Sequence, residues 1–245
     1  MKKLFLLTIL AGMLFACKTN NDSFLNGDVE STRESNYEAS EKFGEVIKED
    51  LIEVRDFKFN ENGNLTTMIF YDEDGEETYK STTTYKNGEA ISHTTQRSDY
   101  LEFTSKGVRV FKDDIKTIWV IKKEEEGKLT SDTIIHTLAE DCKKKTVIEI
   151  KDDGTKSVSY YTYDDKERIV EFKWLMNGVD IQQWEINTYK DNLHTQEDRL
   201  DPKTGDVKDV ITYKYKLDDK QNWIERIEYE NGKATQLTER VINYR

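Results

Sequence analysis

The chain has 245 residues, of which 35% are charged, and its formal net charge is −12. An acidic surface repels phosphate backbones, so the composition argues against a nucleic-acid partner. The sequence contains no CxxC motif and no closely spaced set of cysteines and histidines, which argues against the common zinc sites. We therefore predict no metal and no cofactor.

Residues 1–16 have the layout of a secretory signal peptide, with two lysines before an apolar run that is too short for a transmembrane helix. The end of this run, Leu14-Phe15-Ala16-Cys17, resembles the lipobox of bacterial lipoproteins. The resemblance implies that the signal peptide is removed and that Cys17 becomes the lipid attachment site, acylated with palmitate-type chains. Because Lys18 stands where some Gram-negative bacteria place an aspartate retention signal, the outer membrane is the expected location.

Residues 17–37 are polar and lack apolar periodicity, so we predict a flexible tether after the lipidated cysteine. Ser35 and Glu38 have the spacing of a capping box, and apolar residues follow at helical intervals. This pattern favours a short helix over residues 36–48, at the start of a single domain that spans residues 38–245.

Residues 51–245 contain an internal repeat. Positions about 26 residues apart, counted from Phe59, are aromatic in six of seven cases. A turn with Asn, Asp or Gly follows each position, and a second series of glycine turns lies halfway between them. The repeat predicts an all-β protein: an antiparallel hairpin meander of about seven units and about fourteen strands, forming a broad curved or rolled sheet.

An outer-membrane β-barrel is the alternative that this pattern raises. Such a barrel needs an uncharged band toward the lipid. Glu171 with Lys173, and Arg226 with Glu228, place charges on strand faces where that band would lie. We therefore expect a sheet in water, with one packed face and one solvated face.

The units FKFNENGNL, FYDEDGEE, YTYDDKER and YKYKLDDKQNW resemble the tyrosine-aspartate (YD) repeats of bacterial Rhs-type proteins, above all their short lipid-anchored relatives in the cell envelope. The resemblance covers about residues 51–245 and implies a repetitive β fold and a place outside the cytoplasm. It carries no catalytic residues over to this chain.

Candidate sites are few. His93, His136 and His194 lie at different phases of the repeat, so we expect neither a shared metal site nor a catalytic triad. The motif Asp72-Glu73-Asp74-Gly75 resembles the start of a calcium loop, but hairpin turns require the same residues. Aromatic residues crowd the fifth and sixth units; as ligand-binding residues we select Tyr161, Tyr163, Trp174 and Trp184.

The function expected from these features is that of a lipid-anchored envelope protein without catalytic activity. It would present its β surface to a protein partner, either in the envelope or on a host. The alternative is a surface lipoprotein that binds glycans through the aromatic strip. A hydrolytic enzyme is the third hypothesis, and no motif with a catalytic mechanism supports it.

Overall fold

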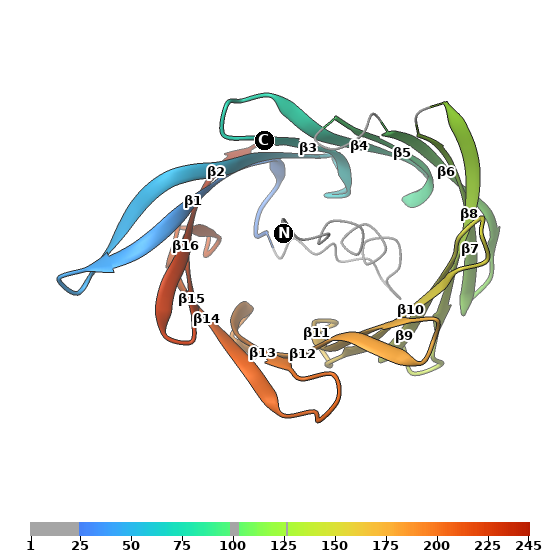
Figure 1. Ribbon diagram of the computed structural model, residues 1–245. Coiled ribbons are helices and arrows are strands. Elements are labelled where there is room, and N and C mark those ends of the chain that lie inside the picture. Colours follow the sequence, from blue (N-terminus) through green and yellow to red (C-terminus); the bar gives the residue numbers. More distant parts are fainter. Residues whose placement is uncertain (1–24, 99–102, 126) are drawn as a thin grey trace.

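The computed structural model describes residues 25–98, 103–125 and 127–245. Within these residues, sixteen strands form one closed antiparallel barrel, in which each strand pairs with its neighbours in sequence and β1 pairs with β16 (Figure 1). The strands are β1 (Val29–Lys42), β2 (Glu45–Phe59), β3 (Leu65–Tyr71), β4 (Glu77–Lys86), β5 (Glu89–Arg97), β6 (Phe103–Lys112), β7 (Lys116–Glu125), β8 (Lys128–Leu138), β9 (Lys144–Ile150), β10 (Lys156–Tyr163), β11 (Ile169–Met176), β12 (Asp180–Lys190), β13 (Leu193–Leu200), β14 (Val207–Leu217), β15 (Trp223–Glu230) and β16 (Lys233–Tyr244).

The antiparallel hairpin meander predicted from the sequence is confirmed. The Asn60 N–H donates to the Asn64 carbonyl at 2.9 Å, and the Asp72 N–H donates to the Glu76 carbonyl at 3.1 Å. In the turn between β4 and β5, Asn87 has a φ of 54° and Gly88 a φ of 79°. Positive φ at both positions is what a tight two-residue hairpin requires.

The recurring tyrosines have a structural role. Three of them donate a hydroxyl hydrogen bond to a backbone carbonyl of the preceding strand: Tyr85 to Leu65 (2.9 Å), Tyr189 to Ile169 (3.1 Å) and Tyr215 to His194 (2.7 Å). Each bond satisfies a carbonyl at one end of a strand pair. At these three positions the repeated tyrosine therefore ties together the ends of two neighbouring strands.

The predictions of about fourteen strands and of a broad curved or rolled sheet are wrong in strand number and in closure. The barrel is closed by β1 and β16, whose register runs from Val29 opposite Tyr244 to Glu38 opposite Gln236. At this seam the Thr238 hydroxyl donates to the Asn36 side-chain oxygen at 2.7 Å, and both residues are buried. Closure leaves no strand edge unpaired, which removes the main route to edge-to-edge aggregation.

The short helix predicted over residues 36–48 is also wrong. These residues form the end of β1, the turn at Phe43 and Gly44, and the start of β2; the two turn residues have φ values of 55° and 82°. Residues 29–37, which we assigned to the tether, belong to β1, because Thr32, Glu34 and Asn36 alternate onto a buried face. In the described part of the chain, no helix is both long and apolar enough to cross a membrane.

The two faces of the wall differ in burial. Inside a closed barrel the side chains converge, so the more buried face lies inward. In β11, Phe172 is buried, whereas the side chains of Glu171 and Lys173 on the other face remain 30% exposed. In β15 the two charged side chains that we noted lie on the inner face instead. Arg226 is opposite the buried Thr238 and therefore points inward. The charges that we noted in the sequence thus lie on opposite sides of the wall.

The β1–β2 hairpin extends beyond the ring of strands (Figure 1). Its base packs on the outer face of β15 and β16, where Ala39 joins Tyr229, Ala234 and Leu237 in a buried cluster. Its tip carries Phe43, whose side chain is fully exposed.

Candidate functional site on the inner wall

An aromatic group lines the inner face of β10 and β11. Tyr161 and Phe172 lie directly opposite each other, with ring centroids 5.1 Å apart, and Val147 completes their buried cluster. Tyr163 and Trp174 pack against this cluster and are only partly buried. Contacts of this kind stabilise a sheet by up to about 1 kcal/mol per cross-strand pair. The partly buried rings also leave an aromatic surface inside the barrel.

The structure divides the four residues that we selected as ligand-binding. Tyr161, Tyr163 and Trp174 lie together on the inner face, but Trp184 lies on the outer face. The Trp184 indole N–H donates to Glu171 Oε1 at 3.0 Å, and Lys173 Nζ lies 4.1 Å from the centre of its ring. Trp184 therefore cannot act with the other three on one ligand.

Next to the aromatic group, the inner face of β12 to β15 is charged. Glu185 is opposite Arg199 in the register of β12 and β13, and Arg199 Nε donates to Glu197 Oε1 at 2.6 Å. The Tyr213 hydroxyl lies 3.5 Å from Glu197 Oε2. On β15, Glu228 is opposite Tyr213. We call Glu185, Glu197, Arg199, Arg226 and Glu228, with Tyr213, the charged arc.

Burial raises the pKa of three groups in the charged arc, Glu185, Glu228 and Tyr213. Desolvation, followed by the nearby charge of Glu197, raises the pKa of Glu185. Desolvation likewise raises the pKa of Glu228. Burial raises the pKa of Tyr215 to about 12 and also raises the pKa of Tyr213. The tyrosine hydroxyls therefore stay protonated at neutral pH, and the arc offers hydrogen-bond donors and acceptors side by side.

A line of rings crosses the charged arc. Successive centroids are 4.8 to 6.4 Å apart, in the order Tyr189, His194, Tyr213, Tyr215 and Trp223; the closest pair is His194 with Tyr213 and the widest is Tyr213 with Tyr215. The Arg240 guanidinium lies 3.2 Å from the centre of the Trp223 ring. Planar groups thus alternate with charged ones along this wall.

The aromatic group and the charged arc meet at one residue. Glu185 is opposite Phe172 on one side and opposite Arg199 on the other. The inner wall therefore changes from aromatic to charged within two strands. The sequence did not reveal this site, because carboxylates are abundant along the chain and only the closure of the barrel tells which of them point inward.

The three histidines lie apart in the inner wall, as their different phases predicted. His93 on β5 and His136 on β8 are buried, and His194 on β13 is half-buried. Burial lowers the pKa of His93 to about 4 and also lowers the pKa of His136 and of His194.

This burial predicts a stability loss in mild acid. A histidine whose folded pKa is depressed contributes stability above its unfolded pKa of 6.5, and that contribution is lost as the pH falls toward its folded pKa of about 4. Between about pH 7 and about pH 5, His93 alone should cost about 2 kcal/mol of unfolding free energy. Urea denaturation at both pH values should show a smaller loss in His93→Leu than in the wild type; equal losses would contradict the assignment.

In the turn Asp72-Glu73-Asp74-Gly75, which resembles the start of a calcium loop, a carboxylate oxygen of Asp72 bonds to the backbone of the same turn. Asp72 Oδ1 accepts backbone N–H groups from Asp74 (3.1 Å) and Glu76 (2.9 Å). Among the described residues, no group of three or more His, Cys, Asp or Glu side chains is placed to hold a metal ion. Cys17, the predicted lipid attachment site, lies outside the described residues.

No protein-family model matches the chain, and no curated protein matches its sequence. Solved structures do match its fold. A porin-like protein from Bacteroides uniformis superposes with a TM-score of 0.52 at 13% sequence identity, covering 89% of this chain and 98% of that one. A porin-like protein from Bacteroides vulgatus gives a TM-score of 0.41 at 9% identity, covering 90% and 99%. At this level of identity, the first likeness concerns the fold alone.

These findings overturn the resemblance to YD repeats of Rhs-type proteins. The chain closes into a sixteen-strand barrel whose fold is similar to that of a porin-like protein, whereas the resemblance implied a repetitive β fold that we expected as a broad curved or rolled sheet. This chain and the YD repeats share Asn, Asp and Gly in their turns, and any array of antiparallel hairpins requires these residues.

Proposed function

We propose that this protein is a lipid-anchored envelope protein whose barrel binds a saccharide on its inner wall, without catalysing a reaction. The observation that carries the proposal is the meeting of the aromatic group and the charged arc at Glu185. A sugar ring presents an apolar face, which stacks on an aromatic ring, and hydroxyl groups, which bond to carboxylates and guanidinium groups. A barrel of about sixteen strands is wide enough for its walls to enclose a ligand.

Charged side chains on the outer face and the shortness of several strands support the proposal that the barrel stands in water. Lys80, Lys106, Lys122, Lys173 and Lys214 all point outward from the middle part of their strands. A lysine at the bilayer midplane costs about 2–4 kcal/mol. In addition, β3 and β9 have only 7 residues and β10, β11, β13 and β15 only 8. A strand that crosses a membrane needs about 9–11 residues.

A water-exposed barrel needs a separate anchor to stay in the envelope, and Cys17 supplies it in this proposal. Cells given a fatty acid with a clickable tag should label the wild-type chain and should not label Cys17→Ser, because only a thiol forms the thioether of the anchor. In-gel fluorescence of the immunoprecipitated chain is the measurement. An unlabelled wild-type chain that is released into the medium would contradict anchoring.

The saccharide proposal is tested on a glycan array with the full-length Cys17→Ser chain. Glu185→Gln should weaken binding about tenfold or more, because it removes a charge-assisted hydrogen bond. Its melting temperature should not fall, since the variant removes a carboxylate whose burial is unfavourable. Trp174→Ala tests the aromatic group, and Trp184→Ala on the outer face is the matched control.

Two results would overturn this proposal. One is the absence of any saturable glycan binding. The other is a loss in Trp184→Ala as large as in Trp174→Ala, because that loss could not arise on the inner wall. Turnover of a glycan by the wild-type chain, abolished in Glu185→Gln, would refute the absence of catalysis.

The second candidate function is the presentation of a β surface to a protein partner. It is favoured by the fully exposed Phe43 at the tip of the projecting β1–β2 hairpin. Single aromatic residues that protrude in this way often anchor protein interfaces. Crosslinking in cells through a photoreactive residue at position 43 should then trap one discrete partner, and a diffuse set of products would count against this function.

A further inference from the structure

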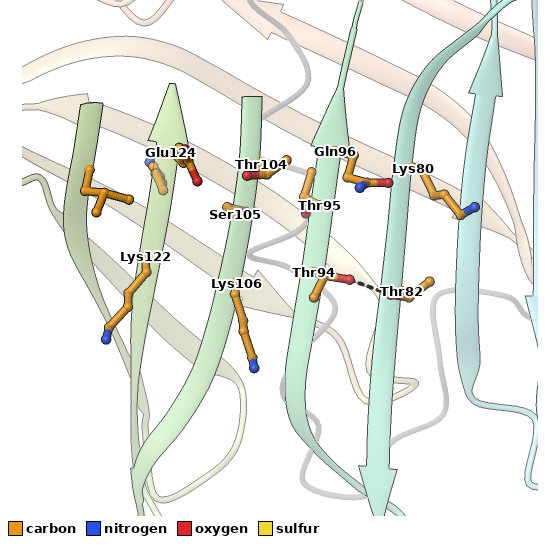
Figure 2. Close-up of a pocket in the computed structure, with 12 residues that line it drawn as sticks. Lys80, Thr82, Thr94, Thr95, Gln96, Thr104, Ser105, Lys106, Lys122 and Glu124 are labelled. Carbon is orange, nitrogen blue, oxygen red and sulfur yellow. Dashed lines mark hydrogen bonds between the residues drawn. The ribbon is translucent and has the colours of Figure 1, made fainter. Parts of the chain in front are cut away.

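A depression of about 420 Å³ lies on the outer face of the barrel over β4 to β8. Among the residues that line it, Thr82, Thr94, Lys106 and Lys122 lie along one side, and Lys80, Gln96, Thr104 and Glu124 lie along the other (Figure 2). This surface belongs to neither the aromatic group nor the charged arc, since it faces away from the inside of the barrel.

Thr82, Thr94, Lys106 and Lys122 form one row across the sheet. Thr82 is opposite Thr94, Thr94 is opposite Lys106, and Lys106 is opposite Lys122. The hydroxyl oxygens of Thr82 and Thr94 are 2.5 Å apart. In Figure 2 the side chains of Lys106 and Lys122 project from neighbouring strands toward the same end of the sheet. Two hydroxyls and two ammonium groups are thus held in line by the backbone register.

The row has an excess of positive charge. In the part of the chain that the structure describes, neither Lys106 nor Lys122 forms an ion pair. The neighbouring Lys123 differs, because it points to the other side of the wall and bonds to Asp132. Glu124 is the single carboxylate among the residues that line the depression. This local excess contrasts with the net charge of −12 for the whole chain.

Two lysines directly opposite each other on neighbouring strands repel one another and destabilise the sheet. An anion bound between them would remove that repulsion. A tetrahedral oxyanion offers several acceptor oxygens, which match the two ammonium and two hydroxyl groups of the row. A flat apolar ligand would instead leave these groups without partners.

We propose that the outer depression of Thr82, Thr94, Lys106 and Lys122 binds a phosphate-type oxyanion. The arrangement explains why a like-charged pair is placed on an otherwise acidic protein. The oxyanion either is free in solution or belongs to the head group of a lipid on which the barrel rests; the chemistry of recognition is the same in both cases.

Isothermal titration of the purified full-length chain with inorganic phosphate tests the proposal, with sodium chloride at equal ionic strength as the blank. Saturable binding in the millimolar range is expected. The double variant Lys106→Gln with Lys122→Gln should weaken it about tenfold or more, because each lysine contributes a charge-assisted hydrogen bond. The matched control, Lys190→Gln with Lys203→Gln, removes the same charge from exposed positions at the end of β12 and in the turn after β13, and should bind as the wild type does.

A single variant separates binding from folding. Lys106→Glu places opposite charges across β6 and β7, so its melting temperature should rise while phosphate binding is lost. Phosphate should raise the melting temperature of the wild type and leave that of Lys106→Glu unchanged. A general loss of structure cannot produce this combination.

Vesicle flotation with the Cys17→Ser chain identifies the source of the oxyanion. Binding to vesicles that contain phosphatidylglycerol, but not to phosphatidylcholine alone, with competition by inorganic phosphate, assigns a lipid head group. Binding of inorganic phosphate without flotation assigns a free oxyanion. The proposal is overturned if the wild type responds neither to phosphate nor to anionic vesicles, or if the control variant loses binding equally.

Discussion

Replacing Arg240 with alanine is expected to lower the free energy of unfolding by about 3–5 kcal/mol. Arg240 on β16 donates to Glu34 Oε1 on β1, with Nε at 2.9 Å and Nη2 at 2.5 Å. Only 14% of the Arg240 side chain and 9% of the Glu34 side chain are exposed. The variant would therefore leave a buried carboxylate without its counter-charge, at the seam that closes the barrel.

The control is an exposed ion pair at the end of the same seam. Arg245 Nη1 donates to Asp28 Oδ1 at 2.5 Å, but the Asp28 side chain is 61% exposed. Asp28→Ala should cost no more than about 1 kcal/mol. The double variant Glu34→Leu with Arg240→Met should regain most of the stability, because an apolar pair often replaces a buried ion pair without loss. Guanidinium denaturation followed by circular dichroism measures all three, and equal losses in Arg240→Ala and Asp28→Ala would contradict the account.

Replacing Gly107 with alanine is expected to cost about 3 kcal/mol, near the upper end for overpacking in a core. A Cβ at this position would lie 2.1 Å from Cε1 of the His93 ring. His93 cannot move away, because it is buried and its ring packs against Trp119 with centroids 5.6 Å apart. The clash therefore falls on backbone and ring atoms that have no free space.

Thermal unfolding of Gly107→Ala beside Ser105→Ala checks this prediction, since Ser105 is two residues earlier on the same face of β6. Ser105→Ala should be nearly neutral. Combining Gly107→Ala with His93→Ala should recover part of the loss, because the smaller side chain makes room for the Cβ. A Gly107→Ala chain as stable as the wild type would mean that His93 and Gly107 are not in contact.

The sequence revealed the hairpins because their signals are local. Asn87 and Gly88 predict a turn from two adjacent residues, and Asp72 bonds to N–H groups only two and four residues away. The recurring tyrosines revealed the length of the repeat. Three of them bond to a carbonyl at the start of the preceding strand, 20 to 21 residues earlier. Such features depend on turn chemistry, which a single sequence displays.

The closure of the barrel by β1 and β16 could not be predicted from local sequence signals. The seam joins Glu34 to Arg240, more than 200 residues later, and no local pattern records that contact. The first hairpin was misread because Ala39, Phe43 and Ile47 happen to fall at helical intervals, although their neighbours alternate as in a strand. A closed pairing of the two ends outweighs this weak helical signal.

The site was only partly predictable for a related reason. Of the four aromatic residues that we selected, Tyr161, Tyr163 and Trp174 lie on the inner face, but Trp184 lies opposite Lys173 on the outer face. The charged arc escaped notice because carboxylates occur on both faces of the wall. Deciding which of them face inward requires the register of the whole barrel.

We propose that the barrel stands in water and is held at the membrane only through Cys17. The most direct test is to express residues 18–245 without detergent and to measure size, circular dichroism and thermal unfolding. We expect a soluble β-rich monomer that unfolds cooperatively, with a melting temperature unchanged by lipid vesicles of phosphatidylcholine. A chain that aggregates in buffer and folds only when detergent micelles or lipid bilayers are added would instead be a barrel that spans the membrane.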